Sequence, residues 1–420
     1  MNVLLTSAGR RAYMVKYFKE ALQGNGSVHA GNSDRISVAF KYADKTVVTP
    51  LIYDAGYIPF LLEYCKRNRI DLLISLFDMD LLMLAKHKKE FEEAGTKVIV
   101  SDPAIIEICN DKWKTFEFLA SNGFHTPRSF LRLDNVLDAI REGELQYPIV
   151  VKPRFGCGSL SVETAYDEED LRCLTKRADY GISHSYLKFE SAVTDEKVIF
   201  QEKLKGEEYG AEVHGDRGGY VVSPPYRIFN TVSGQLNDPL GATTLKYGPI
   251  LNEDLHIEEL RGELRRMADI MGFSGIMEID LVLVRGEWYI LEINNRWSGL
   301  TTLITASQDR LPYDVYVSEA GSDPALLDDV KNLKYALQFK MKNASSDDLE
   351  RISKESGMKS VIQYDVRLPG KEPFSFNDAV IGGYDSMEEL LSGFEALQKK
   401  YPEMISGELT EALKEKEGGR

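Results

Sequence analysis

Residues 275–296 read GIMEIDLVLVRGEWYILEINNR, and they predict two strands joined by a tight turn. GIMEIDLVL and WYILEINNR are apolar runs of strand length, and Arg285-Gly286-Glu287 between them is typical of a hairpin. Glu292 and Asn294 are two residues apart on one strand, so their side chains point to the same face. Asp280 lies on the preceding strand, where we expect it opposite them.

Asp280, Glu292 and Asn294 together offer two carboxylates and an amide oxygen. This set suits Mg²⁺, with phosphates and water completing the octahedron. The alternative is the polar face of an amphipathic hairpin. We favour the metal site because the neighbouring residues are mostly Ile and Leu, and carboxylates that face such a core are costly unless paired or metal-bound. Arg296, two residues further on, could stabilise charge at a phosphoryl or tetrahedral centre, or form a salt bridge with Glu292.

A second segment, VVKPRFGCGSLS (150–161), ends an apolar strand with Lys152 and continues into a glycine- and serine-rich turn. Such a loop lets backbone N–H groups approach phosphate oxygens, while the lysine supplies a point charge. It has neither the GK[ST] ending of a Walker A loop nor the spacing of GxGxxG. A plain hairpin turn is therefore the alternative. Arg227, in PPYRIFN, is a further candidate cation, with a solvated surface position as its alternative.

The composition narrows the class of protein. The chain has 51 Lys+Arg against 66 Asp+Glu, a formal net charge of −15, which argues against a nucleic-acid or anionic-membrane partner. This net charge does not argue against a small anionic ligand bound by a few Lys or Arg side chains. The four cysteines form no CxxC pair, so we expect neither a zinc site nor a disulfide framework. No apolar stretch approaches the ~18 residues of a transmembrane helix, and MNVLLTSAGRR reverses the charge order of a signal peptide. We expect a cytoplasmic protein.

Over about the first hundred residues, short apolar strands alternate with helical patterns. This alternation predicts a doubly wound α/β domain with a parallel sheet. Such domains bind ligands at the carboxyl ends of their strands, here near Ser7–Arg11 and Phe77–Asp78. The expected strands are NVLLTS at 2–7, Val28–Ala30, Lys45–Val48, Asp71–Leu76 and Val98–Val100; Asp80–Ala94 is one amphipathic segment. We expect three parts: an N-terminal α/β domain at 1–110, a central domain at 111–322 and a C-terminal αβ module at 323–420.

The run from Asp111 to Arg296 resembles the ATP-grasp superfamily of ligases, particularly its carbamoyl-phosphate-synthase-like and amino-acid-ligase branches. The shared pattern is an Asp-Lys start, a strand ending in Lys-Pro before a glycine loop, an acidic hinge strand and paired metal-binding strands. In this chain these are Asp111-Lys112, Val151-Lys152-Pro153 with Gly156-Cys157-Gly158-Ser159, Gln201-Glu202-Lys203-Leu204 with Gly206 and Glu208, and Asp280 with Glu292 to Arg296. The implied fold mixes α/β and α+β: an N-terminal doubly wound parallel-sheet domain, the ATP-grasp domains and a C-terminal αβ module.

The resemblance implies a binding site for ATP with Mg²⁺, or with Mn²⁺ in its place. The loop at 154–161 would close over the triphosphate, and Glu208 would bind the ribose. The other implied roles are phosphate contacts for Lys112, Lys152, Gly156, Gly158 and Ser159, adenine contacts for Gln201, Glu202 and Leu204, metal binding for Asp280, Glu292 and Asn294, and stabilisation of the transferring phosphate by Arg227 and Arg296. Two positions depart from the pattern: Gln201 stands where many relatives have Glu, and Glu278 where the dipeptide-ligase branch has Arg.

We therefore expect an ATP-dependent ligase. A carboxylate would attack the γ-phosphate to form an acyl phosphate, and an amine or similar nucleophile would then displace phosphate, with ADP released. The substrates would be small molecules, and the resemblance implies a homodimer. The alternatives are a carbamoyl-phosphate-type reaction on bicarbonate and a non-catalytic ATP-binding sensor. A nicotinamide-dependent oxidoreductase would need three glycines after the first strand, where TSAGRRAYM supplies one.

Overall fold

The computed structural model describes residues 1–156, 161–216, 219–230, 243–308, 313–317, 333–342 and 376–405, with shorter pieces at 344, 348, 351–352, 360–363, 407, 410–411 and 413–414. The chain divides into two compact units. Unit 1 comprises Met1–Val100, Gly210–Glu278 and Arg296–Arg420, and unit 2 comprises Ser101–Tyr209 and Ile279–Asn295.

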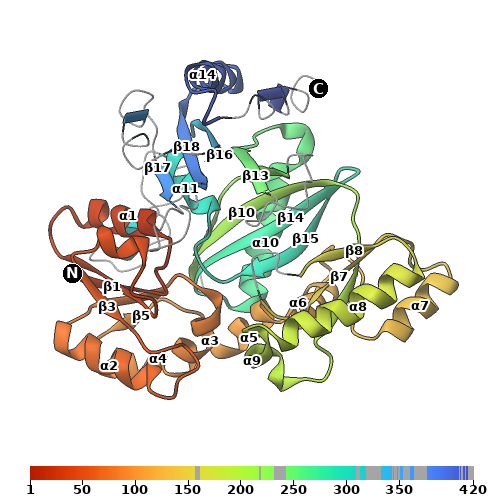
Figure 1. The fold of residues 1–420 in the computed structure, drawn as a ribbon, viewed down its shortest axis with the longest axis horizontal. Coiled ribbons are helices and arrows are strands. Elements are labelled where there is room, and N and C mark those ends of the chain that lie inside the picture. Colours follow the sequence, from red (N-terminus) through yellow and green to blue (C-terminus); the bar gives the residue numbers. More distant parts are fainter. Residues whose placement is uncertain are drawn as a thin grey trace. The chain divides into compact units, whose positions relative to one another are not determined.

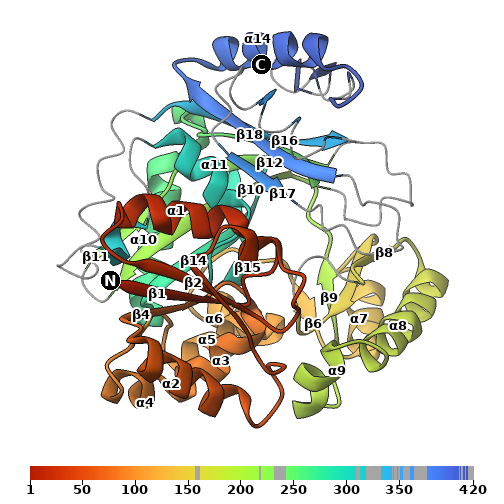
Figure 2. The same ribbon diagram turned by 60° about the vertical axis from the view of Figure 1, so that its left-hand side comes forward.

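Unit 1 begins with a parallel five-stranded sheet of order β3-β2-β1-β4-β5. Helix α1 covers one face, and α2, α3 and α4 cover the other (Figures 1 and 2). Because both faces are covered, strands such as NVLLT are buried along nearly their whole length. The expected doubly wound domain is confirmed. Its elements are β1 (Asn2–Thr6), α1 (Ala12–Leu22), β2 (Ser27–Asn32), β3 (Lys45–Val48), α2 (Tyr57–Asn68), β4 (Leu72–Ser75), α3 (Asp78–Lys86), α4 (Lys88–Glu93) and β5 (Lys97–Val98).

Two helices, α3 and α4, cover the amphipathic segment Asp80–Ala94. They meet at His87, whose backbone leaves the helical region at φ −107° and ψ 8°. The His87 side chain then lies against the first turn of α4, with Nδ1 2.7 Å from Glu90 Oε1. The break lies after Lys86, so the apolar periodicity on either side of it is preserved.

Polar side chains gather at the carboxyl ends of β1 and β4. The carboxylate of Asp80 is fully buried and accepts hydrogen bonds from Thr6 Oγ1 (3.1 Å), Ser7 Oγ (3.2 Å), Tyr57 Oη (2.7 Å) and Ser75 Oγ. Burial raises the pKa of Asp80, and the hydroxyl donors oppose that rise. The network ties the ends of two neighbouring strands to the starts of α2 and α3.

Unit 2 contains a four-stranded antiparallel sheet of order β6-β9-β7-β8. Helices α7 and α8 pack on it through a buried cluster that includes Val136, Ile149, Leu171 and Phe200. The elements are α5 (Pro103–Asn110), α6 (Lys112–Ser121), β6 (Ser129–Phe130), α7 (Leu133–Arg141), β7 (Ile149–Pro153), β8 (Glu163–Ala165), α8 (Glu168–Ser183), α9 (Leu187–Glu190) and β9 (Val198–Glu202).

A third sheet has the order β15-β14-β10-β12-β13-β16-β18-β17, with β11 paired to β10. The predicted turn between β14 and β15 is confirmed, because Arg285 (φ 51°) and Gly286 (φ 87°) both take the positive φ that a two-residue hairpin turn requires. Its elements, with the helices between them, are β10 (Glu207–Asp216), β11 (Gly219–Val222), β12 (Tyr226–Asn230), β13 (Thr243–Gly248), α10 (Ile257–Met271), β14 (Gly275–Val284), β15 (Glu287–Asn294), α11 (Leu300–Ser307), α12 (Asp314–Val317), β16 (Tyr335–Lys342), β17 (Ser360–Gln363), β18 (Phe376–Tyr384) and α14 (Met387–Lys400).

The expected C-terminal strands extend this sheet. β16 is antiparallel to β13, with Leu245 opposite Phe339, and β18 continues on the other side of β16. Helix α14 packs on them through Phe394, whose ring centroid lies 4.9 Å from that of Phe339. The helix expected at about 346–355 lies mostly outside the described residues, and the division into three domains stays a prediction. No helix in the described part of the chain combines the length and apolarity needed to cross a bilayer.

Candidate active site

Three separate segments of unit 2 meet at Lys112. This lysine is the first residue of α6, and its Nζ lies 3.1 Å from Glu292 Oε1 on β15. The same Nζ donates a 2.6 Å hydrogen bond to the carbonyl of Gly156, just after β7. The Lys112 side chain is 9% exposed and that of Glu292 is 22% exposed, so the ion pair is partly shielded from water.

Lys152, on β7, is a second buried cation, and the charges of Lys112, Glu292 and Asp280 act on it. Burial lowers its pKa to about 8; Glu292 and Asp280 oppose that fall, and Lys112 adds to it. Glu292, Lys112 and Asp280 therefore lie within electrostatic range of Lys152 in unit 2. In the sequence, these residues span from position 112 to position 292.

The β14–β15 hairpin brings Asp280 and Asn294 together, with Asn294 Nδ2 3.4 Å from Asp280 Oδ2. With Glu292, they supply two carboxylates and one amide, a donor set that fits Mg²⁺ when phosphate and water complete the coordination. Among the described residues no group of three or more His, Cys, Asp and Glu side chains could hold a metal ion by itself. The set fits a metal ion that arrives with a polyphosphate, and metal binding by these residues stays a prediction.

Asp111 has a structural role that the sequence did not reveal. Its carboxylate caps α6 by accepting from the Trp113 amide (3.0 Å), and it also pairs with both sides of the Arg154 guanidinium. Arg154 Nε lies 2.7 Å from Asp111 Oδ1, and Nη2 lies 2.8 Å from Oδ2. The positive charge of Arg154 is thereby neutralised within unit 2, and the pair fixes the start of α6, where Lys112 begins.

The segment predicted to contact adenine begins with Gln201 and Glu202, the last two residues of β9, and continues to Leu204. The Gln201 side chain is buried and donates to Ser129 Oγ (2.8 Å), and the Glu202 amide donates to the Arg128 carbonyl (2.9 Å). These two groups are therefore engaged within the protein, and the adenine contacts of Gln201, Glu202 and Leu204 stay predictions. Leu204 is half-buried and Glu208 is exposed at the start of β10.

Gly156 is the last residue described before the centre of the glycine-rich turn. Its φ of 96° is a conformation that favours glycine. Gly158 and Ser159 lie outside the described residues, as does Cys157. Their predicted contacts with phosphate stay predictions.

Arg296 belongs to unit 1, where it is almost fully buried. Its Nε donates to Asp78 Oδ2 (2.8 Å), and its Nη1 lies 3.6 Å from Glu278 Oε2. Asp78 begins α3 after β4, at the carboxyl end of a strand, as the sequence predicted. Two acidic groups therefore fix the guanidinium.

Arg227 lies on β12, also in unit 1, opposite Tyr247 on β13. It is 5% exposed, so the alternative of a solvated surface arginine is wrong. Its guanidinium carbon lies 5.8 Å from the centre of the Phe229 ring. The catalytic roles expected for Arg227 and Arg296 stay predictions.

Unit 1 also contains a buried acidic group that sequence reasoning missed. Glu212 is fully buried on β10; its Oε2 lies 3.1 Å from His214 Nε2, and its Oε1 accepts from Thr301 Oγ1. The signal was present in the sequence AEVHG, because strand residues two apart share a face. Without the neighbouring Thr301, which is 89 residues away in the sequence, nothing distinguished this pair from an exposed one.

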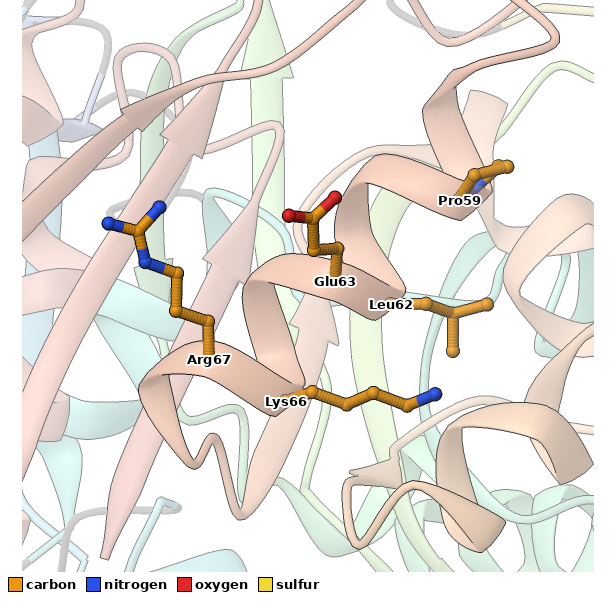
Figure 3. A pocket seen from close by; sticks show the side chains of 5 residues that line it. All are labelled: Pro59, Leu62, Glu63, Lys66 and Arg67. Atoms are coloured by element: carbon orange, nitrogen blue, oxygen red, sulfur yellow. The ribbon is translucent and has the colours of Figure 1, made fainter.

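A surface hollow runs along the solvent side of α2 (Figure 3). It is lined by Pro59, Leu62, Glu63, Lys66 and Arg67, of which Leu62 is half-buried and the others are exposed. None of the site residues predicted from the sequence lines it. We therefore assign no function to this hollow.

Comparisons with known families match both the N-terminal sheet domain and the segment that contains Lys112, Lys152 and the β14–β15 hairpin. Residues 3–99 match the PylC-like N-terminal domain, and residues 109–300 match the ATP-grasp domain. The chain therefore contains an ATP-grasp domain. ATP-grasp domains bind ATP with Mg²⁺. The fold expected from the resemblance is thus confirmed.

Individual relatives of this ATP-grasp protein are distant. It is 19% identical over 276 residues to the C-terminal section of the carbamoyl phosphate synthase large chain from Aquifex aeolicus, covering 66% of this chain and 48% of that one. It is 23% identical over 279 residues to the carbamoyl phosphate synthase large chain of Thermoplasma acidophilum, covering 65% and 25%. The chain thus spans half or less of these curated relatives. The L-amino acid ligase of Bacillus licheniformis shares the fold, with TM-score 0.70, 17% identity and 95% and 97% coverage.

Proposed function

We propose that the protein activates a small-molecule carboxylate as an acyl phosphate at the expense of ATP and joins it to an amine, releasing ADP and phosphate. The observation that carries this proposal is the meeting of two lysines and two carboxylates in unit 2: Lys112, Lys152, Asp280 and Glu292. The lysines match a polyphosphate, and the carboxylates match the divalent cation that accompanies it.

Each group has a role in this reaction. When bound, Mg²⁺ neutralises charge on the phosphates. Asp280, Glu292 and Asn294 would hold it, while Lys112 and Lys152 bind phosphate oxygens. Lys112 now pairs with Glu292, so phosphate would replace that carboxylate as its partner while the Gly156 carbonyl keeps the ammonium oriented. Catalysis would consist mainly of positioning and charge neutralisation.

The amino-acid ligase of the same fold supports amino acids as the first acceptors to test. Incubation with Mg–ATP, a carboxylate pool and an amino-acid pool should release ADP and phosphate in equal amounts. Acyl phosphate formation can be detected without the amine, because reversible γ-phosphoryl transfer scrambles the β,γ-bridging oxygen of ¹⁸O-labelled ATP. If no pool supports ADP release or oxygen scrambling, the proposal is wrong.

Two variants test the site itself. Lys152→Ala and Glu292→Gln should each lower kcat/KM by at least about a hundredfold, the scale of losing one placed electrostatic group. Lys66→Ala, on the exposed side of α2, and Glu263→Gln, in an exposed pair with Arg266, are matched controls that should leave it unchanged. Full activity in Lys152→Ala would contradict the assignment.

The carbamoyl phosphate synthase relatives favour a second candidate, phosphorylation of bicarbonate. This reaction would use the same lysines and metal ligands, with bicarbonate in place of the organic acid. ADP release that depends on bicarbonate and needs no added carboxylate or amino acid would support it. Release that depends on an organic acid would exclude it.

A further inference from the structure

The two described residues that flank the glycine-rich turn both rest on one region of unit 2, the end of α8 and the start of α9. A Cβ built on Gly156 would lie 2.3 Å from Leu187 Cδ2, so the leucine side chain packs directly on the glycine backbone. At the other end, a Cβ built on Gly181 would lie 3.3 Å from Ser161 Oγ. We refer to Gly181 and Leu187 as the loop support.

The core packing around Leu187 fixes the position of its side chain, and therefore that of Gly156, which it contacts. It is 1% exposed and belongs to the buried cluster that includes Leu171, Ile182 and Val151. Interiors packed at this density shift little without energetic cost. The position of the Leu187 side chain, and with it the space left for Gly156, is therefore set by the core between α8 and the sheet.

The position of Gly156 in turn determines the position of Lys112, which is expected to bind phosphate. Its carbonyl accepts the 2.6 Å hydrogen bond from Lys112 Nζ, and that same ammonium lies 3.1 Å from Glu292 Oε1. If Gly156 moves, the acceptor that orients Lys112 moves with it. A hydrogen bond to a charged group depends steeply on distance and angle, so a small displacement suffices.

We propose that Leu187 is a positioning residue of the nucleotide site: it holds Gly156, Gly156 holds Lys112, and Lys112 meets the polyphosphate. This inference rests on the proposed function, because it assumes that Lys112 binds phosphate. Because Leu187 acts through Gly156 and Lys112, we expect its effect on nucleotide affinity.

The test compares two leucines of the same cluster. Leu187→Ala removes the contact with Gly156, whereas Leu171→Ala opens a cavity in the same core at a residue that is not among the atoms nearest to Gly156. Both should lower the thermal midpoint by a similar amount. Only Leu187→Ala should weaken binding of a fluorescent ADP analogue, by about tenfold, the scale of a loosened charge-assisted hydrogen bond. It should raise KM for ATP more than it lowers kcat.

Further Leu187 variants show whether a loss of ADP affinity comes from the missing contact with Gly156. Leu187→Met, of similar volume, should restore ADP affinity to within about twofold of wild type. If Leu187→Ala does not fold, Leu187→Val shortens the side chain more gently and should give a smaller loss. Equal losses of affinity in the Leu187 and Leu171 variants, or none in either, overturn the proposal. A wild-type protein that binds no ADP overturns the proposed function together with this inference.

The other half of the loop support gives an independent check. Gly181→Val places a branched side chain against Ser161 and should also weaken ADP binding several-fold. Gly262→Ala, on α10, has open space around it and should leave ADP affinity unchanged. Unchanged affinity in Gly181→Val would remove Gly181 from the loop support.

Discussion

Removing one partner of the pair between Asp111 and Arg154 should be among the most destabilising single changes in unit 2. The Asp111 side chain is 6% exposed and that of Arg154 11%, and two hydrogen bonds of 2.7 and 2.8 Å join them. Asp111→Asn keeps the shape and can still cap α6, but it removes the negative charge and leaves a buried guanidinium uncompensated. Removing one partner of such a pair costs about 3–5 kcal/mol.

This cost can be measured by urea unfolding followed by circular dichroism. With a slope of about 2 kcal/mol per M, a loss of 3 kcal/mol lowers the midpoint by about 1.5 M. Asp111→Asn should also weaken ADP binding, because the Lys112 amide donates to the Arg154 carbonyl at 3.1 Å and the start of α6 would loosen.

Glu263→Gln is the control for a charge lost from an exposed ion pair, and it should change stability by less than about 0.5 kcal/mol. The double variant Asp111→Asn with Arg154→Met should recover part of the loss, because no buried charge then remains. If Asp111→Asn unfolds at the same urea concentration as Glu263→Gln, the pair contributes nothing and the reasoning is refuted.

Two buried side chains and one glycine in close backbone contact give three further predictions. ADP affinity should fall as the pH rises through about 8, because Lys152 is charged only below that pKa and phosphate binds the charged form; isothermal titration at several pH values checks this, and Lys152→Met should not show the fall. Gly206→Ala should destabilise unit 2 by about 1–3 kcal/mol in urea unfolding, because its Cβ would lie 2.3 Å from the Leu283 carbonyl oxygen; the mutation is harmless if the unfolding curves coincide. Cys65, whose pKa burial raises to about 12, should resist iodoacetamide at pH 8 in the folded protein while the exposed Cys173 reacts, as peptide mass spectrometry would show.

Much of the fold follows from local patterns. Alternating apolar runs and helical periodicity predict the parallel sheet, and the Arg285-Gly286 turn predicts the β14–β15 hairpin. Residue spacing alone placed Asp280, Glu292 and Asn294 on facing strands, and in the structure Asp280 and Asn294 lie within hydrogen-bond distance. These features depend on residues close in sequence, where alternation and turn chemistry are strong constraints.

Other features depend on which distant segments pack together. Arg154 begins the loop expected to close over the triphosphate, but its partner is a carboxylate 43 residues earlier, and only the packing of the start of α6 against the end of β7 reveals it. The buried group of Glu212, His214 and Thr301 likewise joins β10 to α11. A sequence pattern gives the face on which a side chain lies, but it does not give the element that packs on that face.

The pairing of β16 with β13 has a practical consequence for anyone shortening the chain. Backbone groups from Leu245 to Gly248 are paired with Ala336 to Phe339, and the Leu337 and Phe339 side chains are fully buried. A fragment that stops before β16 would turn β13 into an open sheet edge with unsatisfied amides and carbonyls beside exposed apolar surface. Such edges recruit strands from other molecules, so the fragment should aggregate even though it retains every residue assigned here to nucleotide binding.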